Sequence, residues 1–369
     1  MTPSSPAARR PPRAGQVGQQ LHVIMHGREV ATLTSPVAKT LHLTYTDDAA
    51  AVTRGLSCSL PAVGVRYSGA RVDNWIRGLL PDRSEVLTRW RAHYGVQRQD
   101  AYALLWHVGE DVAGAARFVR PDRLDALPDP AAATPLTEAA IGARISQLAV
   151  DAAAWAPSPG TGQFSLAGAQ AKFALALRSD GTWIEPSGDT PTTHIFKPAI
   201  PNMPDQDLNE HLTMRLARAV GLPVARTELM VFDGQRVLVV TRFDRFQAPD
   251  GQWHRVHQED AVQALGMPSA LKYEQHGGPG VRSIADLLRQ NVTGGHHHLD
   301  IGTFVDAVAF NWLVVGTDAH ARNYSLMHHG MNTRLAPLYD LNSFLPYAHP
   351  DRPSSLSMKV GFSEYDPAR

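Results

Sequence analysis

The chain has 369 residues, of which 43% are hydrophobic and 19% are charged, and its 35 basic and 35 acidic residues give a formal net charge of zero. This length exceeds what one compact core normally serves, so we expect a globular protein of two or three lobes. The charge balance excludes a protein that grips nucleic acid over a broad face by itself, because neutralising phosphates requires a surplus of cations. If this protein reaches DNA, we expect a partner to carry it there.

The cysteine content and the start of the chain predict a cytoplasmic protein without a membrane contact. Cys58 is the only cysteine, which rules out an internal disulfide framework and favours a reducing compartment. No apolar run approaches the ~20 residues that cross a bilayer. Residues 1–20 contain arginines and prolines but no apolar segment, so we expect a disordered tail rather than a secretory signal.

The first structured elements predict a small α+β lobe. Apolar stretches at 21–25 and 29–33 flank a His-Gly-Arg sequence and predict a hairpin. Helical patterns follow at 84–94, with Ser84 as the N-cap, and at 100–107.

A segment rich in proline, alanine and aspartate follows at 121–136 and predicts a linker. A helix is expected from 137 to 155. Strands are then predicted at 172–178 and 192–197, and Asp-Gly between 227–232 and 236–243 is a strong hairpin signal.

One helix is predicted between these strands, because apolar residues recur on a single helical face and Gly221 suits a left-handed C-cap. The apolar positions are Leu208, Leu212, Leu216 and Val220.

Beyond Gln258 the pattern becomes mainly helical, with helices predicted at 258–265, at 283–290 with Ser283 as the N-cap, and at 301–315. A polar loop at 317–323 then leads into a predicted hairpin of 324–327 and 335–339. A sheet-rich lobe followed by a helix-rich lobe is a layout in which a nucleotide can occupy the cleft between them.

The polar loop contains the most informative residues. Asp318 and Asn323 have the spacing of a protein-kinase catalytic loop, in which the Asp accepts or orients the substrate hydroxyl and the Asn ligates Mg²⁺. The same spacing also fits a capped loop without chemistry. Asp340, reached through the short hairpin, adds a second acid that would complete a magnesium site of hard oxygen ligands.

Lys197 and a glycine-containing loop supply the other parts of a phosphoryl-transfer site. A lysine at the end of an apolar strand is costly unless its ammonium finds an anion, either a phosphate or the carboxylate of Glu210. The loop at 165–170 precedes a strand, so its backbone N–H groups could cover phosphates. An exposed strand-end lysine and an ordinary turn are the alternatives, but the order of all these features matches the order that such a site requires.

Two histidine features have simpler explanations than catalysis. Three consecutive imidazoles, His296 to His298, cannot all face one metal ion, and we expect a solvated loop there. His320 lies between the catalytic candidates, where a hydrogen bond that structures the loop is expected rather than acid–base chemistry.

These motifs together resemble the HipA family over residues 21 to 360. The segments that carry the resemblance are SLAGAQAK (165–172), THIFKP (193–198), NE (209–210), TRFDR (241–245), QED (258–260), KYE (272–274), GGPG (277–280), TDAHARN (317–323) and YD (339–340).

The resemblance implies an α+β, two-lobed protein-kinase-like fold with a sheet-rich N-terminal lobe and a helical C-terminal lobe. It implies an ATP- and Mg²⁺-dependent serine/threonine kinase that is the toxin of a toxin–antitoxin pair, with a HipB-like helix-turn-helix antitoxin that supplies DNA binding. The substrate would be a protein such as glutamyl-tRNA synthetase or another aminoacyl-tRNA synthetase. The expected domains are a tail (1–20), an N-terminal subdomain (21–120), a linker (121–136), a kinase N-lobe-like core (137–256) and a helical catalytic lobe (257–369).

The resemblance also implies a role for each matching residue. Asp318 would be the catalytic base, Asn323 and Asp340 would hold Mg²⁺, and Ser165 would be autophosphorylated, which ejects the phosphate loop and inactivates the kinase. The groups that would contact ATP are Ser165, Leu166, Ala167, Gly168, Ala169, Gln170, Lys197, Thr241, Phe243 and His320, with Glu210 and Gln258 in support.

The sequence departs from the family pattern in three places. Thr241 replaces a glutamate in the hinge, Ala171 replaces a glutamate in the loop, and the chain stops at Arg369, so we expect the C-terminal helices of the family to be missing. Two alternatives remain open. One is a catalytically impaired, kinase-like module that binds an antitoxin, and the other is a small-molecule or lipid phosphotransferase on the same fold.

Overall fold

The computed structural model describes residues 20–36, 40–63, 65–96, 100–124, 133–151, 153–154, 165, 167–168, 170–186, 190–201, 203–249, 251–348 and 354–360. Residues 1–19 of the predicted tail (1–20), Trp155, and the loop residues Leu166 and Ala169 lie outside this description. Gln20 is not part of a tail but begins the first strand. The helix predicted to run to 155 ends at Val150, where Asp151 turns extended.

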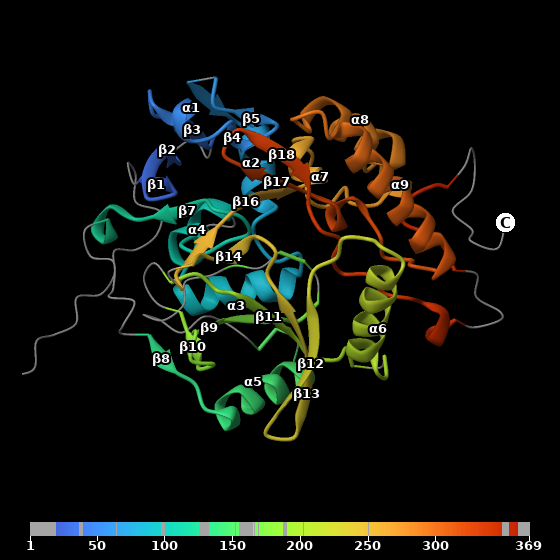
Figure 1. Ribbon diagram of the computed structural model, residues 1–369. Helices are drawn as coiled ribbons and strands as arrows, with labels where there is room; N and C mark the ends of the chain where they lie inside the picture. Colours follow the sequence, from blue (N-terminus) through green and yellow to red (C-terminus); the bar gives the residue numbers. More distant parts are fainter. Residues whose placement is uncertain are drawn as a thin grey trace, which may run out of the picture.

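The N-terminal part is a five-stranded antiparallel sheet in the order β6-β3-β2-β1-β7, with helices packed against it (Figure 1). The strands are β1 (Gln20–Met25), β2 (Arg28–Thr34), β3 (His42–Tyr45), β6 (Arg66–Ser68) and β7 (Arg117–Val119). The helices are α1 (Ala49–Val52), α2 (Ala70–Arg77), α3 (Ser84–Tyr94) and α4 (Ala101–Val108).

Buried and partly exposed residues alternate along β1, which gives this lobe one sheet face that faces its own core. Leu21, Val23 and Met25 are buried while the residues between them are partly exposed, as a strand with one covered face requires. The predicted hairpin is confirmed by the pairing of β1 with β2. The predicted N-cap is wrong, because Arg83 occupies that position without a side-chain cap and Ser84 is already the first helical residue.

The central part is a six-stranded sheet in the order β12-β13-β11-β9-β10-β8. Its strands are β8 (Thr134–Pro135), β9 (Phe173–Leu177), β10 (Trp183–Glu185), β11 (His194–Lys197), β12 (Thr227–Phe232) and β13 (Gln235–Thr241). The predicted linker is wrong at its end, because β8 pairs with β10 and belongs to this sheet. The Asp-Gly hairpin is confirmed, since Asp233 and Gly234 both have positive φ angles, as a tight hairpin turn favours.

Two helices contact the long hairpin of this sheet, α5 (Glu138–Val150) and α6 (Gln206–Ala219) (Figure 1). The α6 stripe predicted from apolar spacing does not face the core: Leu212, Leu216 and Val220 are 51%, 50% and 63% exposed. The buried face of α6 includes Asp207 and Glu210 instead, because each carboxylate has a basic partner on the sheet.

The C-terminal part combines a three-stranded sheet with helices. Its elements are β16 (His257–Asp260), α7 (Ala261–Ala264), α8 (Val281–Asn291), α9 (His297–Leu313), β17 (Ser325–His329) and β18 (Asn332–Leu335). Short hairpins are formed by β14 (Arg245–Gln247) with β15 (Trp253–Arg255) and by β4 (Gly55–Ser57) with β5 (Leu60–Pro61).

Four predictions for this part are wrong in detail. The hairpin predicted after the polar loop is present, but its second strand is 332–335 rather than 335–339. The start of the helix predicted at 258–265 is a strand, because residues 257–260 pair with β17. Ser283 lies inside α8, which begins after Gly280. The histidine run is not a loop, since His297 and His298 form the first turn of α9.

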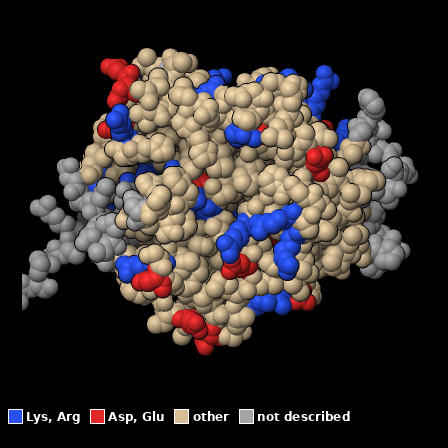
Figure 2. Space-filling view, in the orientation of Figure 1, with Lys and Arg blue, Asp and Glu red and all other residues tan. Residues whose placement is uncertain are grey.

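The surface charge is mixed. In the view of Figure 2, basic and acidic side chains are interspersed among uncharged residues, as expected for a net charge of zero. Among the described residues, no helix combines the length and the apolar character that a bilayer crossing would need.

Candidate active site

A cleft of about 580 Å³ lies where the central sheet, the three-stranded sheet and the N-terminal part meet. It is lined by most of the residues that the sequence singles out: Ala167, Gly168, Gln170, Lys197, Glu210, Thr241, Phe243, Gln258, Asp318, His320, Asn323 and Asp340. Ser165 does not line it and is fully buried next to it.

Lys197 connects two carboxylates at one side of the cleft. Its Nζ donates to Glu210 Oε1 at 2.7 Å and to Asp340 Oδ1 at 2.5 Å. Burial alone would lower the pKa of Lys197, but the two carboxylates outweigh this effect and raise it. Lys197 is therefore held as an ammonium, and the strand-end lysine is buried rather than exposed.

Asp340 is held in an unusual backbone conformation beside this lysine. Its φ of 60° lies in the left-handed region, which is rare for a residue other than glycine and concentrates at functional sites. Burial acts to raise the pKa of its carboxyl, but Lys197 and Lys172 overcome it and hold this pKa well below its usual range. The carboxylate is thus available as an anionic ligand at all physiological pH values.

Asp318 lines the same cleft and faces solvent. Its side chain is 66% exposed, and it accepts a hydrogen bond of 2.7 Å from the Tyr273 hydroxyl. Asn323 donates its amide nitrogen to the Asp318 carbonyl at 2.8 Å, which leaves the amide oxygen as the group that can take a ligand. The loop thereby fixes an exposed carboxylate and an amide oxygen relative to each other.

His320, within the same loop, is buried. Its Nδ1 has no hydrogen-bond partner among the described residues, so this atom does not form the hydrogen bond that was expected to structure the loop. Burial lowers its pKa, although the nearby Asp318 opposes the effect, so the ring is neutral at pH 7. Its ring packs edge-on against Tyr273, with centroids 5.1 Å apart.

Arg322 ties the loop to the rest of the protein. Its guanidinium donates to Asp260 Oδ2 at 2.9 Å, to the Gly78 carbonyl at 2.8 Å and to Asp82. Because Gly78 and Asp82 follow α2, the N-terminal part directly supports the loop that presents Asp318.

The segment predicted to cover phosphates also docks on the N-terminal part. Ser165 Oγ donates to the Leu79 carbonyl at 2.8 Å, and Ser165 N donates to the Asp111 carbonyl at 3.0 Å. Gly168 has a φ of 107°, a left-handed conformation that favours glycine.

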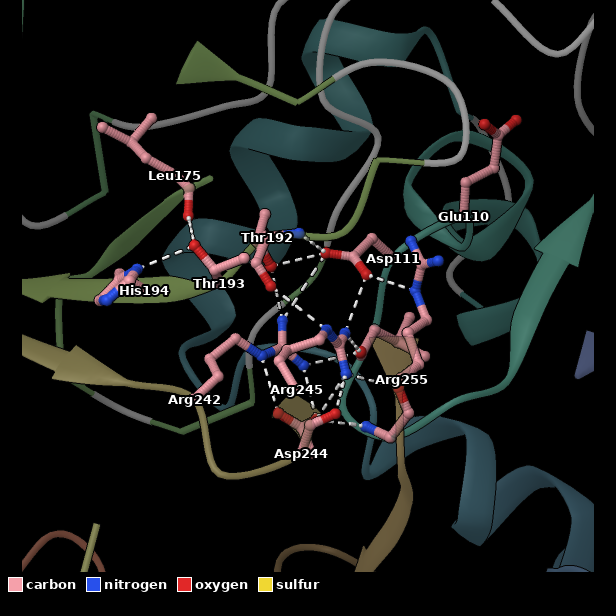
Figure 3. Close-up of polar contacts among 12 residues, drawn as sticks. Glu110, Asp111, Leu175, Thr192, Thr193, His194, Arg242, Asp244, Arg245 and Arg255 are labelled. Carbon is pink, nitrogen blue, oxygen red and sulfur yellow. Dashed lines mark hydrogen bonds and ion pairs between the residues drawn. The ribbon is translucent and has the colours of Figure 1, made fainter. Parts of the chain in front are cut away.

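The predicted hinge is anchored by a buried ionic network (Figure 3). Arg242 donates to both oxygens of Asp244, at 2.9 and 2.7 Å, while Arg245 donates to Asp111 Oδ1 at 2.8 Å. Asp111 Oδ2 also accepts from Thr192. Buried charges persist only when paired in this way, so the network fixes the path of residues 241–245 beside the cleft.

Sequence reasoning missed several residues that the structure adds to the cleft, namely Asp82, Lys172, Lys272, Tyr273 and Arg322. Lys172 Nζ donates to the Ala167 carbonyl at 2.9 Å, within the segment predicted to cover phosphates. The available signal was a lysine directly next to an apolar strand, since Lys172 precedes β9 just as Lys197 ends β11.

The donor set fits a hard divalent cation. Asp340 and Asn323 provide a carboxylate and an amide oxygen on the same cleft, and exposed Asp318 is nearby. Magnesium prefers such oxygen ligands and retains several waters.

Models of known families match most of the chain. The HipA-like C-terminal domain matches residues 164–368, and the HipA N-terminal domain matches residues 21–119. The chain belongs to the HipA family. The solved complex of HipA, HipB and operator DNA from Shewanella oneidensis superposes with a TM-score of 0.79, at 26% identity, over 94% of this chain and 81% of that one. The two-lobed α+β fold expected from the sequence is thereby confirmed.

Relatives of this HipA-family chain include proteins named as kinases. A putative kinase, Y4mE, from Sinorhizobium fredii is 39% identical over 83% of this chain and 72% of its own length. The serine/threonine-protein kinase toxin HipA of Shewanella oneidensis is 30% identical over 89% of this chain and 75% of its own length.

Proposed function

We propose that the protein is an ATP- and Mg²⁺-dependent serine/threonine protein kinase and the toxin of a toxin–antitoxin pair. The observation that carries this proposal is the arrangement of one cleft. Lys197, paired with Glu210 and Asp340, lies on one side, and Asp318 and Asn323 lie on the catalytic loop. These are the parts that a phosphoryl-transfer site needs.

ATP would bind with its phosphates near the basic groups of the cleft. Lys197 and Lys172 provide ammonium groups beside the segment that contains Gly168. The adenine would lie against the hinge, where Phe243 packs on Tyr339 with ring centroids 5.3 Å apart. Thr241 replaces the family glutamate there, but adenine recognition by backbone groups does not need that side chain.

Transfer would begin at an exposed hydroxyl of a protein substrate. Asp318 accepts the hydroxyl proton, the oxygen attacks the γ-phosphorus, and the bond from that phosphorus to the β-phosphate oxygen breaks to release ADP. The Tyr273 hydroxyl orients the Asp318 carboxylate for this step. Mg²⁺ held by Asn323 and Asp340 would neutralise charge on the phosphates.

Ser165 is proposed as the site of autophosphorylation and inactivation. It is fully buried and hydrogen-bonded to the N-terminal part, so modification requires the segment to undock first. A phosphoryl group carries about −1.5 to −2 charges and does not fit a buried site lined by carbonyl acceptors. A phosphorylated Ser165 would therefore keep the segment out of the cleft.

The proposed partner is a HipB-like helix-turn-helix antitoxin. The solved relative from Shewanella oneidensis is a complex with HipB and operator DNA. The zero net charge of this chain agrees with DNA contact through a partner. The proposed substrate is a translation-related protein such as glutamyl-tRNA synthetase or another aminoacyl-tRNA synthetase, within the cytoplasm.

The test is incubation of the purified protein with labelled ATP and Mg²⁺, followed by mapping of the labelled residue. The matched variant is Asp318→Asn, which keeps the shape of the side chain and its hydrogen bond from Tyr273. Loss of a positioned general base costs about 10²–10⁴-fold in rate. Wild-type activity in a folded Asp318→Asn protein would refute the assignment, and an inactive wild type would favour a kinase-like binding module.

A further inference from the structure

Three potential metal ligands meet outside the cleft, where the N-terminal part contacts the three-stranded sheet. Cys58 lies in the turn between β4 and β5, Glu259 lies on β16, and His328 lies on β17. One donor atom from each side chain lies within 4.8 Å of the other two. We propose that these three residues bind a single divalent transition-metal ion of the Zn²⁺ type.

Glu259 is the central ligand, and its environment leaves one oxygen without a partner. Its Oε1 accepts hydrogen bonds from Cys58 N at 2.7 Å and from His328 Nε2 at 3.1 Å. Its Oε2 is buried and has no hydrogen-bond partner within the described part of the chain, and the residue is 1% exposed. A buried carboxylate oxygen without a donor is costly, and a bound cation would remove that cost.

His328 is oriented in the manner of a metal ligand. Its Nδ1 is hydrogen-bonded to Thr333 Oγ1 at 3.1 Å. While Nε2–H donates to Glu259, Nδ1 accepts from this hydroxyl; with a metal ion on Nε2, the ring proton would lie on Nδ1 and donate to Thr333 Oγ1. Metal-binding histidines are usually held by such a partner on the second nitrogen, which fixes the ring and the tautomer.

The combination of ligand types selects the metal. Thiolate, imidazole and carboxylate form a ligand set typical of Zn²⁺, with bonds of about 2.0–2.3 Å, and the thiolate and imidazole are poor ligands for Mg²⁺. These bond lengths place tetrahedral ligands about 3.3–3.8 Å apart. Glu259 Oε1 and His328 Nε2, at 3.1 Å, already lie close to this spacing. The most distant pair of the three donor atoms, which lies within 4.8 Å, would close by about 1 Å on binding. The Cys58 thiol loses its proton to solvent on binding, and water fills the fourth position.

The neighbouring histidine does not provide a fourth ligand. The ring of His257 lies 5.5 Å from that of His328, but both of its nitrogens are engaged. Nδ1 accepts from Ala115 N at 3.3 Å, and Nε2 donates to the Leu56 carbonyl at 3.0 Å.

A metal ion here would join two parts of the protein that are distant in sequence. Cys58 belongs to the N-terminal part, whereas Glu259 is next to Asp260, which binds the catalytic-loop residue Arg322. The ion would therefore reinforce a contact that supports the candidate active site without touching the cleft.

The experiment is a Co²⁺ titration of the full chain after removal of metals. Since Cys58 is the only cysteine, a thiolate-to-cobalt charge-transfer band in the near ultraviolet reports on this site alone. We expect the band to saturate at one Co²⁺ per chain, to disappear on addition of Zn²⁺ and to persist in excess Mg²⁺. Absence of the band in the folded wild-type protein would overturn the proposal, with no variant needed.

Variants assign the band to its ligands. Cys58→Ser and His328→Gln should abolish it, and Thr333→Val should weaken Co²⁺ affinity about 10–100-fold by releasing the ring. His297→Ala is the matched control and should change nothing, because it removes an imidazole from the histidine run on α9. An undiminished band in a folded His328→Gln protein would also overturn the proposal.

Discussion

Replacement of Lys172 by methionine should weaken ATP binding without weakening the fold. Burial and the neighbouring Lys197 lower the pKa of Lys172 from 10.5 to about 8. At 1.36 kcal/mol per pKa unit, this corresponds to about 3 kcal/mol for keeping the ammonium charged at pH 7. The side chain still borders the cleft, so screening by solvent reduces this cost to about 1.5 kcal/mol.

Methionine has a similar shape and no charge, so Lys172→Met removes the cost of keeping a buried ammonium charged. It also removes the hydrogen bond to the Ala167 carbonyl, which contributes about 1 kcal/mol. We therefore expect the nucleotide-free variant to unfold at the same denaturant concentration as the wild type or slightly above it. A loss of more than about 1 kcal/mol in the free energy of unfolding would refute this reasoning.

The same lysine predicts how ATP affinity depends on pH. Phosphates favour the ammonium form, so ATP raises the pKa of Lys172, and affinity must fall as pH rises through 8 in the free protein. The charged fraction in the free protein falls from about 0.9 at pH 7 to about 0.1 at pH 9, which predicts about a tenfold loss of ATP affinity over that range. Calorimetric titration at constant Mg²⁺ tests this, and an identical pH profile in Lys172→Met would exclude Lys172 as the cause.

The pKa of Lys172 also has a consequence for stability. Because its folded value is below the unfolded one, the unfolded chain binds more protons between about pH 8 and pH 10.5. The contribution of this group to the free energy of unfolding therefore rises with pH in that window.

Three other predictions concern the cleft. Asp340→Ala and Asn323→Ala should lose most of the stabilisation by Mg²⁺-ATP. For the wild type this stabilisation is about 2.7 kcal/mol when ATP is present at 100 times its dissociation constant. An unchanged thermal shift on addition of Mg²⁺-ATP would contradict their role as ligands. Ser165→Asp should weaken ATP binding, because a carboxylate replaces a buried donor, whereas Ser165→Ala should bind ATP normally; equal affinities in calorimetry would remove the switch. Tyr273→Phe should lower kcat about tenfold with KM unchanged, since it frees Asp318 from one hydrogen bond, and a change in KM alone would contradict this.

Several cleft residues could be predicted from the sequence because the patterns that point to them are local. Because burying an unpaired lysine is costly, the sequence predicted an anionic partner such as Glu210 for Lys197, and the structure contains this ion pair. Asp318 and Asn323 were linked by a spacing that one short loop must satisfy, and they do meet through a hydrogen bond. The role of each residue in phosphoryl transfer stays a prediction.

The remaining features depend on tertiary contacts that no local pattern contains. The apolar stripe of α6 is exposed because the carboxylates of Asp207 and Glu210 bind Arg236 and Lys197 on the opposite face. The strand at 257–260 has helical spacing but pairs with a segment about seventy residues away. Ser165 was expected to cover phosphates, yet its burial against Leu79 depends on how the N-terminal part docks.

The ionic network at the hinge implies that separating the two family-matched segments would cost stability. Asp111 belongs to the N-terminal segment, and it is a counter-ion of Arg245 and Arg255 in the C-terminal one. A chain lacking residues 21–119 would leave these buried guanidinium groups short of one carboxylate, and removal of one partner from a buried pair costs about 3–5 kcal/mol. The protein should therefore melt in a single cooperative transition, and proteolytic loss of the N-terminal segment should disrupt the candidate active-site cleft itself.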